Sequence, residues 1–143
     1  MVQVAGAGHD QPMPLKLLIV DDSELIHTSL RGLTADIPGI AAVQTAASLT
    51  QAIKSVRSDP PDLVILDLHL PDGISLDIIP SLEKLAPGVL IAVLTNDAHA
   101  CNRVKSLAAG ARWFFDKSTE FSQLLDVVRQ QAALRLPNHP RTP

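Results

Sequence analysis

Short hydrophobic runs alternate with segments of helical spacing along the middle of the chain. The first run occupies residues 17–20, and its uninterrupted hydrophobic character predicts a buried strand. The hydrophobic positions after this run recur every three or four residues, which predicts an amphipathic helix: Ile26, Leu30, Leu33 and Ile37. We expect this helix to end at Pro38-Gly39, because both residues interrupt helical structure.

The next segments repeat this order of strand and helix. Residues 40–46 predict a second strand, and Ser48 with Gln51 has the spacing of a capping box at the start of a second helix. A third hydrophobic run at residues 63–66 predicts another buried strand after a pair of prolines.

The third helix is expected within residues 74–85. Pro80 lies inside it and predicts either a kink or a late start, because an interior proline costs about 3 kcal/mol. The remaining pattern predicts two more strand and helix pairs, with Gly110 ending the fourth helix: a strand at 89–94, a helix at 103–109, a strand from Trp113, and a helix with one face formed by Phe121, Leu124, Leu125 and Val128.

Five strands that alternate with five helices predict an α/β fold. Such a chain forms a doubly wound parallel sheet with right-handed crossovers and helices on both faces. Hydrophobic residues make up 46% of the 143 residues but aromatic residues only 3%, so we expect a core of Leu, Ile, Val and Ala. We expect one domain over residues 15–135, and disordered tails over residues 1–14 and 136–143, where small residues, glycine and proline gather.

Charge and composition exclude several classes of function. The formal net charge of −3 comes without a long basic stretch, so we expect no direct contact with nucleic acid. Cys101 is the only cysteine, which excludes an internal disulfide and agrees with a reducing compartment. The chain has no secretory signal pattern, and no hydrophobic run approaches the ~20 residues that span a bilayer. We therefore expect a soluble, cytoplasmic protein that does not contact membrane.

Polar residues follow four of the five predicted strands. The carboxyl ends of parallel strands share one edge of the sheet, where open α/β sheets bind ligands. Carboxylate oxygens grouped there attract a hard divalent cation such as Mg²⁺, and a carboxylate can also attack phosphorus to give an aspartyl phosphate. The candidate site residues are Asp21, Asp22, Asp67, Thr95 and Lys117.

Each of these residues also has an ordinary structural interpretation. Asp22 can cap the following helix, Thr95 is common in strands, Asp67 can form a turn, and Lys117 can be a solvated surface charge. The functional interpretation is favoured because all of them are predicted at the same edge of one sheet.

Three stretches of the sequence resemble the receiver domains of two-component response regulators, of the chemotaxis-regulator-like, single-domain type. These stretches lie at residues 18–22, 66–73 and 110–117, and the resemblance covers about residues 15–133. It implies a flavodoxin-like sheet with strand order 2-1-3-4-5. It also implies a phosphoprotein of a phosphorelay, phosphorylated on Asp67 with Mg²⁺ by a histidine kinase or a phosphotransfer protein.

The resemblance assigns a role to each site residue. Asp22 would bind Mg²⁺ directly, Asp21 through water, and Asp67 and the backbone carbonyl of His69 would complete the metal ligands. Thr95 and Lys117 would bind phosphoryl oxygens, and Phe114 would be the aromatic residue that moves on activation. The fourth helix, fifth strand and fifth helix would then signal to an unknown downstream protein, without substrate turnover of the kind that defines an enzyme.

Four positions are expected to modify this behaviour. Asn96 is larger than the residue usual in the family and predicts restricted access for phosphodonors. Ser118 in place of proline predicts a trans peptide bond after Lys117. His69 and Asp97 lie two residues after Asp67 and Thr95, and we expect their side chains to control the lifetime of the aspartyl phosphate.

Other functions remain open at this point. The chain can be a receiver-like module that binds a partner without phosphorylation. An aspartyl-nucleophile phosphatase is less favoured, because His69 stands where a second carboxylate is needed. A flavin-binding module is disfavoured by acidic loops where a phosphate would lie. The sequence also leaves open whether the chain is a free-standing regulator or a fragment of a larger one, and which kinase, target and oligomeric state it has.

Overall fold

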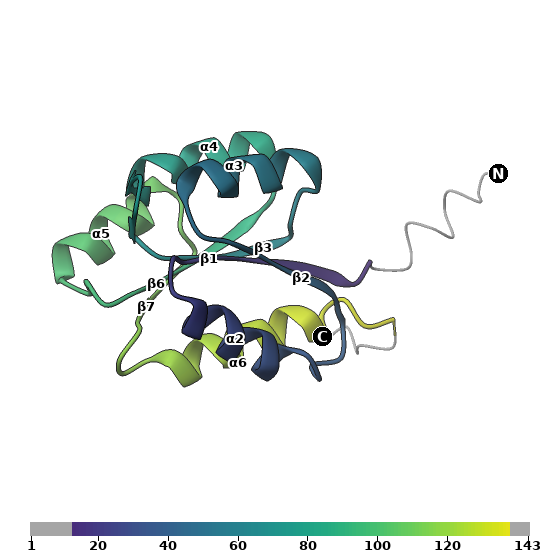
Figure 1. Ribbon diagram of the computed structural model, residues 1–143. Coiled ribbons are helices and arrows are strands. Elements are labelled where there is room, and N and C mark those ends of the chain that lie inside the picture. The colour runs from purple at the N-terminus through teal and green to yellow at the C-terminus, as the bar shows by residue number, and fades with distance from the viewer. Residues whose placement is uncertain (1–12, 138–143) are drawn as a thin grey trace.

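A five-stranded parallel sheet forms the centre of the structure, a computed structural model that describes residues 13–137 (Figure 1). The expected tails lie largely outside the described residues. The strand order, from one edge to the other, is β2 (Ile40–Ala46), β1 (Leu15–Val20), β3 (Leu63–Leu66), β6 (Leu90–Thr95) and β7 (Trp113–Asp116). Counted along the chain within this sheet, the order is 2-1-3-4-5, so the prediction of a doubly wound parallel sheet is confirmed.

Helices cover both faces of the sheet (Figure 1). One face carries α2 (Glu24–Thr34) and α6 (Phe121–Ala133). The other face carries α3 (Leu49–Ser58), the short 3-10 helix η1 (Ser75–Ile78), α4 (Ile79–Leu85) and α5 (Ala100–Ala109).

Two hydrophobic clusters fill the space between the helices and the sheet. Alternate residues of β1 contribute to different clusters: Leu17 and Ile19 pack with α2 and α6, whereas Leu18 and Val20 pack with α3 and α4. All residues of β3 are buried. Burial on both faces explains why the strands appear in the sequence as continuous hydrophobic runs rather than as alternating ones.

Proline and glycine determine where several helices begin or end. Pro80 lies in the first turn of α4, where its missing N–H has no helical partner to lose, so the late-start interpretation is correct. Gly110 ends α5 with a φ of 125°, as predicted. Ser48 and Gln51 form a reciprocal cap of α3: the Ser48 hydroxyl accepts from the Gln51 N–H, and the Gln51 side chain accepts from the Ala47 N–H.

Several predicted boundaries were wrong by one to four residues, including the first strand, which begins at Leu15 rather than at Leu17. The first helix ends at Thr34 rather than at Pro38-Gly39, and Ile37 packs against the core from the following turn. The fourth helix begins at Ala100, three residues before the predicted start, and the fourth strand is shifted by one residue. Helix ends depend on capping and packing contacts that hydrophobic spacing does not encode.

A small antiparallel hairpin, absent from the sequence prediction, lies between β3 and η1. Its strands are β4 (His69–Leu70) and β5 (Gly73–Ile74), with His69 opposite Ile74 and Leu70 opposite Gly73. Gly73 has a φ of 147°, a conformation that residues with a side chain rarely adopt. The hairpin directs the chain from the carboxyl edge of the sheet to α4.

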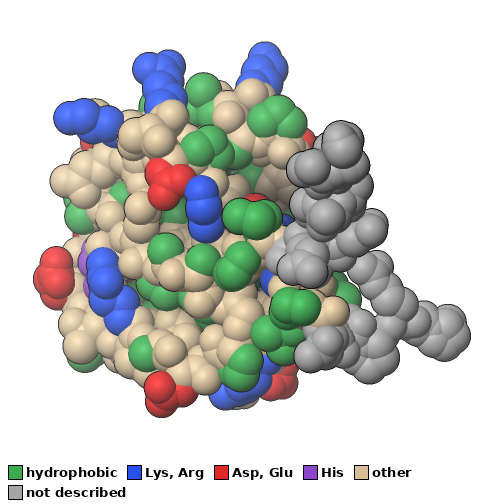
Figure 2. Space-filling view, turned by 90° about the vertical axis from the view of Figure 1, so that its right-hand side faces the viewer, with side chains coloured by type: hydrophobic (Ala, Val, Ile, Leu, Met, Phe, Trp, Pro, Cys, Tyr) green, Lys and Arg blue, Asp and Glu red, His purple; other side chains and the backbone are tan. Residues whose placement is uncertain are grey.

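Figure 2 shows the face on the side where β1 begins, away from the carboxyl ends of the strands. Lys and Arg side chains stand at separate places on this face, with hydrophobic and acidic side chains between them. Among residues 13–137, no helix combines the length and hydrophobicity that crossing a bilayer requires.

Candidate functional site

Three carboxylates meet at the carboxyl ends of β1 and β3. Asp21, Asp22 and Asp67 each offer a carboxylate oxygen, and these oxygens lie within 4.8 Å of one another. Backbone hydrogen bonds continue the sheet through two of them: the Asp21 N–H donates to Ala46, and the Asp67 N–H donates to Val20. Asp21 and Asp67 are buried, whereas Asp22 is exposed to solvent. The cluster therefore has a rigid inner side and an open outer side.

Lys117 places its ammonium group between the two buried carboxylates. Its Nζ donates to Asp21 Oδ2 at 2.8 Å and to Asp67 Oδ2 at 3.0 Å. Lys117 follows β7, and its backbone N–H donates to the Thr95 carbonyl, which fixes it beside β6. Burial lowers the pKa of Lys117, but the hydrogen bonds and charges of Asp21 and Asp67 outweigh burial and raise the pKa above its ordinary value. The side chain is thus a cation that partly neutralises the acidic cluster.

Thr95 is the last residue of β6 and is fully buried. Its hydroxyl oxygen accepts a hydrogen bond from the Asp97 N–H at 3.1 Å. The hydroxyl therefore lies at the start of the loop between β6 and α5, at the same edge of the sheet as Lys117.

The N-cap of α2 is Ser23, so the interpretation of Asp22 as a helix cap was wrong. The Ser23 hydroxyl accepts from the Ile26 N–H, and the Ser23 N–H donates to Asp21 Oδ1. Two adjacent residues were both suited to capping, and the structure leaves the Asp22 carboxylate for the acidic cluster. By contrast, Asp67 does form the local turn expected of it: its Oδ1 accepts from the His69 N–H at 3.3 Å, while its carboxylate also belongs to the acidic cluster.

His69 and Asp97 are in direct contact across the site. His69 Nε2 and Asp97 Oδ2 are 2.5 Å apart, and His99 Nε2 lies 3.4 Å from the other oxygen of Asp97. The hydrogen bond with His69 is the main cause that lowers the pKa of Asp97 below its ordinary value. The contact links the loop after β3 to the loop after β6. The sequence pattern singled out His69 and Asp97 but not His99.

Phe114 on β7 is 3% exposed and packs into the cluster below α3 and α4. The guanidinium carbon of Arg103, on α5, lies 5.0 Å from the centre of the Phe114 ring. Arg103 also lies 3.5 Å from Glu120, which follows β7. Sequence analysis identified Phe114 but missed Arg103, since the contact depends on how α5 packs against β7.

Ser75 is a second residue that sequence analysis missed. Its hydroxyl donates to the backbone carbonyl of Asp67. No sequence motif marks Ser75, and its contact with Asp67 is seen only in the folded structure, where Ser75 is completely buried.

Two of the expected modifying positions can be placed. Asn96 directly follows Thr95 and is exposed to solvent. Peptide bonds throughout residues 13–137 are trans, including the bond before Ser118, as predicted.

The carboxylate cluster fits a hard divalent cation. All of its donors are oxygens, their spacing allows a single ion to be shared, and exposed Asp22 leaves room for water ligands. That chemistry suits Mg²⁺ or Ca²⁺ and disfavours Zn²⁺, which prefers nitrogen and sulfur. Coordination by the carbonyl of His69 stays a prediction.

The fold and the site together define a class: a doubly wound α/β domain with a carboxylate cluster and a lysine paired with it at the carboxyl edge of the sheet. The family model of the response regulator receiver domain matches residues 17–129, so the chain belongs to this family. Receiver domains are the phosphorylated signalling domains of two-component systems, and the resemblance to the receiver family is confirmed.

Individual relatives agree with this assignment. The chain is 30% identical over 120 residues to the nitrate/nitrite response regulator protein NarL of Escherichia coli K12. The matched region covers 84% of this chain and 56% of NarL. It thus spans about half the length of the curated relatives it matches.

Solved structures of receivers are also similar. A CheY-like receiver domain protein from Methanospirillum hungatei has a TM-score of 0.75 and 26% identity, covering 85% of this chain and 96% of that one. A response regulator from Burkholderia pseudomallei has a TM-score of 0.71 and 28% identity, covering 84% of this chain and 69% of that one. The latter structure contains a phosphorylated aspartic acid, a calcium ion and citrate.

Proposed function

We propose that Asp67 of this receiver accepts a phosphoryl group from a histidine kinase or a phosphotransfer protein. The observation that carries the proposal is the position of Asp67: it is central in a cluster with Asp21 and Asp22 and is paired with Lys117. The phosphorylated aspartic acid in the Burkholderia pseudomallei regulator supports the same chemistry.

In the proposed reaction, a carboxylate oxygen of Asp67 attacks the phosphorus of a phosphohistidine. The new O–P bond forms as the P–N bond breaks, and the imidazole leaves with the electron pair and takes a proton from solvent. Bound Mg²⁺, held by Asp21, Asp22, Asp67 and the His69 carbonyl, would neutralise charge on the transferred oxygens.

Lys117 and Thr95 are proposed to bind the transferred phosphoryl group. Lys117 already lies 3.0 Å from Asp67 Oδ2, so a phosphoryl group attached to Asp67 comes within reach of its ammonium group. For Thr95, the hydroxyl has to exchange its contact with the Asp97 N–H for one with a phosphoryl oxygen. This exchange would couple the chemistry to the loop between β6 and α5.

The output surface is proposed to be the face formed by α5, β7 and α6. Phosphorylation would shift a two-state equilibrium in which Phe114 and its Arg103 neighbour change their packing. Phe114 has no hydroxyl, so its state has to be sensed through packing. Val104 and Leu107 expose hydrophobic side chains on α5, which suits contact with a downstream protein.

The contact between His69 and Asp97 is proposed to set the lifetime of the aspartyl phosphate. The two side chains join the segment that follows Asp67 to the loop that follows β6, and they would restrict the approach of water to Asp67. Asn96, exposed beside them, would restrict the approach of phosphodonors.

Residues 15–135 are proposed to act as one signalling domain in the cytoplasm. Its role would be to receive and pass on a signal by protein contact, with no direct nucleic-acid contact and no dedicated substrate turnover.

Intact-protein mass after incubation with acetyl phosphate and Mg²⁺ tests the proposal. We expect a phosphoryl adduct on the wild type and none on Asp67→Asn. An adduct that survives in Asp67→Asn would place the acceptor elsewhere. If the wild type gives no adduct, and beryllofluoride leaves its amide NMR spectrum unchanged, the alternative of a phosphorylation-independent binding module replaces this proposal.

A further inference from the structure

The hydroxyl of Ser75 contacts the backbone of the proposed phosphoacceptor. Ser75 begins η1, and none of its surface is exposed. Its Oγ donates to the Asp67 carbonyl oxygen at 2.5 Å, and its N–H donates to the Leu68 carbonyl at 2.8 Å. Serine is usually found at the surface, and most buried hydroxyl groups form a hydrogen bond. The partner of the Ser75 hydroxyl is the backbone carbonyl of Asp67, the proposed phosphoacceptor.

Ser75 completes a set of contacts that holds every polar atom of Asp67. The Asp67 N–H donates to Val20, Oδ1 accepts from the His69 N–H, and Oδ2 accepts from Lys117. The carbonyl oxygen is the fourth polar atom, and Ser75 supplies its contact. Because a peptide group is planar and rigid, fixing this carbonyl fixes the direction in which the chain leaves Asp67 toward His69.

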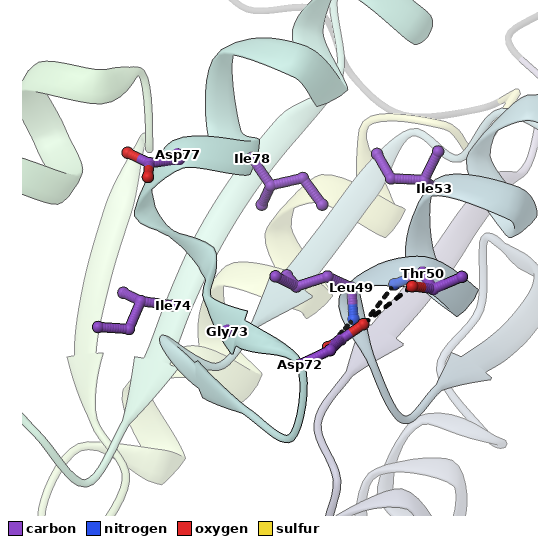
Figure 3. Close-up of a pocket in the computed structure, with 8 residues that line it drawn as sticks. All are labelled: Leu49, Thr50, Ile53, Asp72, Gly73, Ile74, Asp77 and Ile78. Carbon is purple, nitrogen blue, oxygen red and sulfur yellow. Dashed lines mark hydrogen bonds between the residues drawn. The ribbon is translucent and has the colours of Figure 1, made fainter.

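The hairpin that immediately precedes Ser75 is itself anchored to α3. Asp72, at the hairpin turn, accepts hydrogen bonds from the backbone N–H groups of Leu49 and Thr50 at 2.8 and 3.0 Å (Figure 3). These backbone hydrogen bonds lower the pKa of Asp72 below its ordinary value, so the anchor is ionised at neutral pH. The hairpin is thus held at its turn by α3 and at its base by Ser75. Ser75 is therefore a fixed point from which Asp67 can be oriented.

We propose that Ser75 is a positioning residue of the phosphoacceptor site. Through the Asp67 carbonyl it sets the orientation of the Asp67 carboxylate and of the segment that leads to His69. Both the rate of phosphoryl acceptance and the affinity for Mg²⁺ then depend on the Ser75 hydroxyl, because both require ligands and nucleophile in fixed geometry. The effect on rate rests on the proposed function, whereas the effect on Mg²⁺ affinity rests only on the acidic cluster.

A purely structural serine would behave differently. Loss of its hydrogen bond would lower the free energy of unfolding, but at a temperature where the variant stays folded the Mg²⁺ affinity and the phosphorylation rate would be unchanged. A positioning role predicts that both quantities change in the folded protein. It also predicts altered NMR shifts of the Asp67 carbonyl carbon and the Leu68 amide nitrogen, the two atoms of the peptide group that Ser75 fixes.

The test compares Ser75→Ala with a matched control, Ser106→Ala. Ser106 is also completely buried, but its hydroxyl has no hydrogen-bond partner among residues 13–137. Thermal unfolding first identifies a temperature at which all variants are folded. The Mg²⁺ affinity is then measured by amide NMR titration, and the rate of adduct formation with acetyl phosphate by intact-protein mass.

For Ser75→Ala we expect a phosphorylation rate at least about fivefold lower, the lower limit for a buried carbonyl left without its partner. We also expect Ser75→Ala to bind Mg²⁺ more weakly than the wild type. The phosphorylation rate and the Mg²⁺ affinity of Ser106→Ala should equal those of the wild type. If both serine variants match the wild type in rate and affinity, the proposal is overturned.

Two further outcomes are decided by the Mg²⁺ titration. If the wild type forms no adduct, the proposed function fails, and the change in Mg²⁺ affinity alone supports or overturns the role of Ser75. If the wild type does not bind Mg²⁺ either, the role of Ser75 is also overturned.

Should Ser75→Ala not fold, Ser75→Cys replaces it, because a thiol is of similar size but a weak donor. Lower Mg²⁺ affinity in that variant supports the proposal, and unchanged affinity overturns it.

Discussion

Lys117 Nζ lies 3.0 Å from Asp67 Oδ2 and 2.8 Å from Asp21 Oδ2, so one ammonium group is shared by two buried carboxylates. The arrangement costs desolvation energy for all the charges, and their mutual attraction offsets this cost only while the set is complete. The ion pair therefore links the stability of the fold to the charge balance of the proposed phosphoacceptor site.

Replacement of Lys117 by methionine removes the cation and leaves the carboxylates to repel one another. We expect the free energy of unfolding to fall by about 2–3 kcal/mol without Mg²⁺, somewhat less than for a completely buried pair. Added Mg²⁺ should then stabilise the variant more than it stabilises the wild type. Urea denaturation with and without Mg²⁺ measures both effects. Lys105→Met, on the exposed side of α5, serves as control and should leave stability unchanged.

The same ion pair predicts how stability responds to alkaline pH. The pKa of Lys117 is raised above 10.5 in the folded protein, so its contribution is fully present below 10.5 and is lost as pH rises through the folded value. Stability of the wild type should therefore fall above pH 10.5 more steeply than that of Lys117→Met. Parallel slopes for the two proteins would show that Lys117 does not carry this dependence.

Substitution of Asp22 by asparagine tests the metal site without disturbing the buried pair. Asp22 is exposed, so relief of repulsion should raise stability without Mg²⁺ by at most about 0.5 kcal/mol. The Mg²⁺ affinity should drop by about tenfold or more, equivalent to about 1.4 kcal/mol. Calorimetric titration measures the affinity, with Asp36→Asn, an exposed carboxylate after α2, as control. Equal affinities for the two variants would contradict the assignment of Asp22 as a ligand.

The contact between His69 and Asp97 predicts that the aspartyl phosphate lasts longer in the wild type than in variants that lack the contact. We expect the decay rate to rise by about fivefold in His69→Ala, Asp97→Ala and the double variant alike, which corresponds to about 1 kcal/mol of activation free energy. Similar effects in single and double variants are expected because the two side chains act through one contact. Loss of the phosphoryl adduct over time, followed by mass, gives the rate. An unchanged rate in the double variant would eliminate this role.

The packing of Arg103 on Phe114 predicts separate effects on stability and chemistry. Arg103→Ala should lower stability by about 0.5–1 kcal/mol through the lost contact with the ring, whereas Phe114→Ala should cost about 3–5 kcal/mol. The phosphorylation rate of Arg103→Ala should equal that of the wild type. The amide NMR shifts of β7 residues after beryllofluoride addition should differ between Arg103→Ala and the wild type. Arg129→Ala on α6 controls for loss of an exposed charge. Wild-type shifts in Arg103→Ala would remove Arg103 from the switch.

Much of the fold was predictable because buried parallel strands form continuous hydrophobic runs, as in residues 63–66. The convergence of Asp21, Asp67 and Lys117 was also predictable, since topology alone brings strand ends to one edge. The hairpin from His69 to Ile74 was not, because strands of two residues carry no periodicity.

Contacts between side chains were the least predictable part of the site. The choice of Ser23 over Asp22 as the helix cap depends on backbone geometry at two adjacent residues that are both suited to the role. The bond from Ser75 to Asp67 and the stacking of Arg103 on Phe114 arise from how the turn after each element brings the chain back against its neighbour. No spacing rule connects such residues.

The ion pair between Asp21 and Lys117 joins residues that are 96 positions apart, near opposite ends of the domain. During synthesis, the acidic residues leave the ribosome long before the lysine that neutralises them. A growing chain that ends before β7 therefore has these carboxylates without their ammonium partner, and it gains the Lys117 counter-charge only when the last strand docks. Completion of the sheet and maturation of the site are thus one event, so a chain truncated before Lys117 would lose both together.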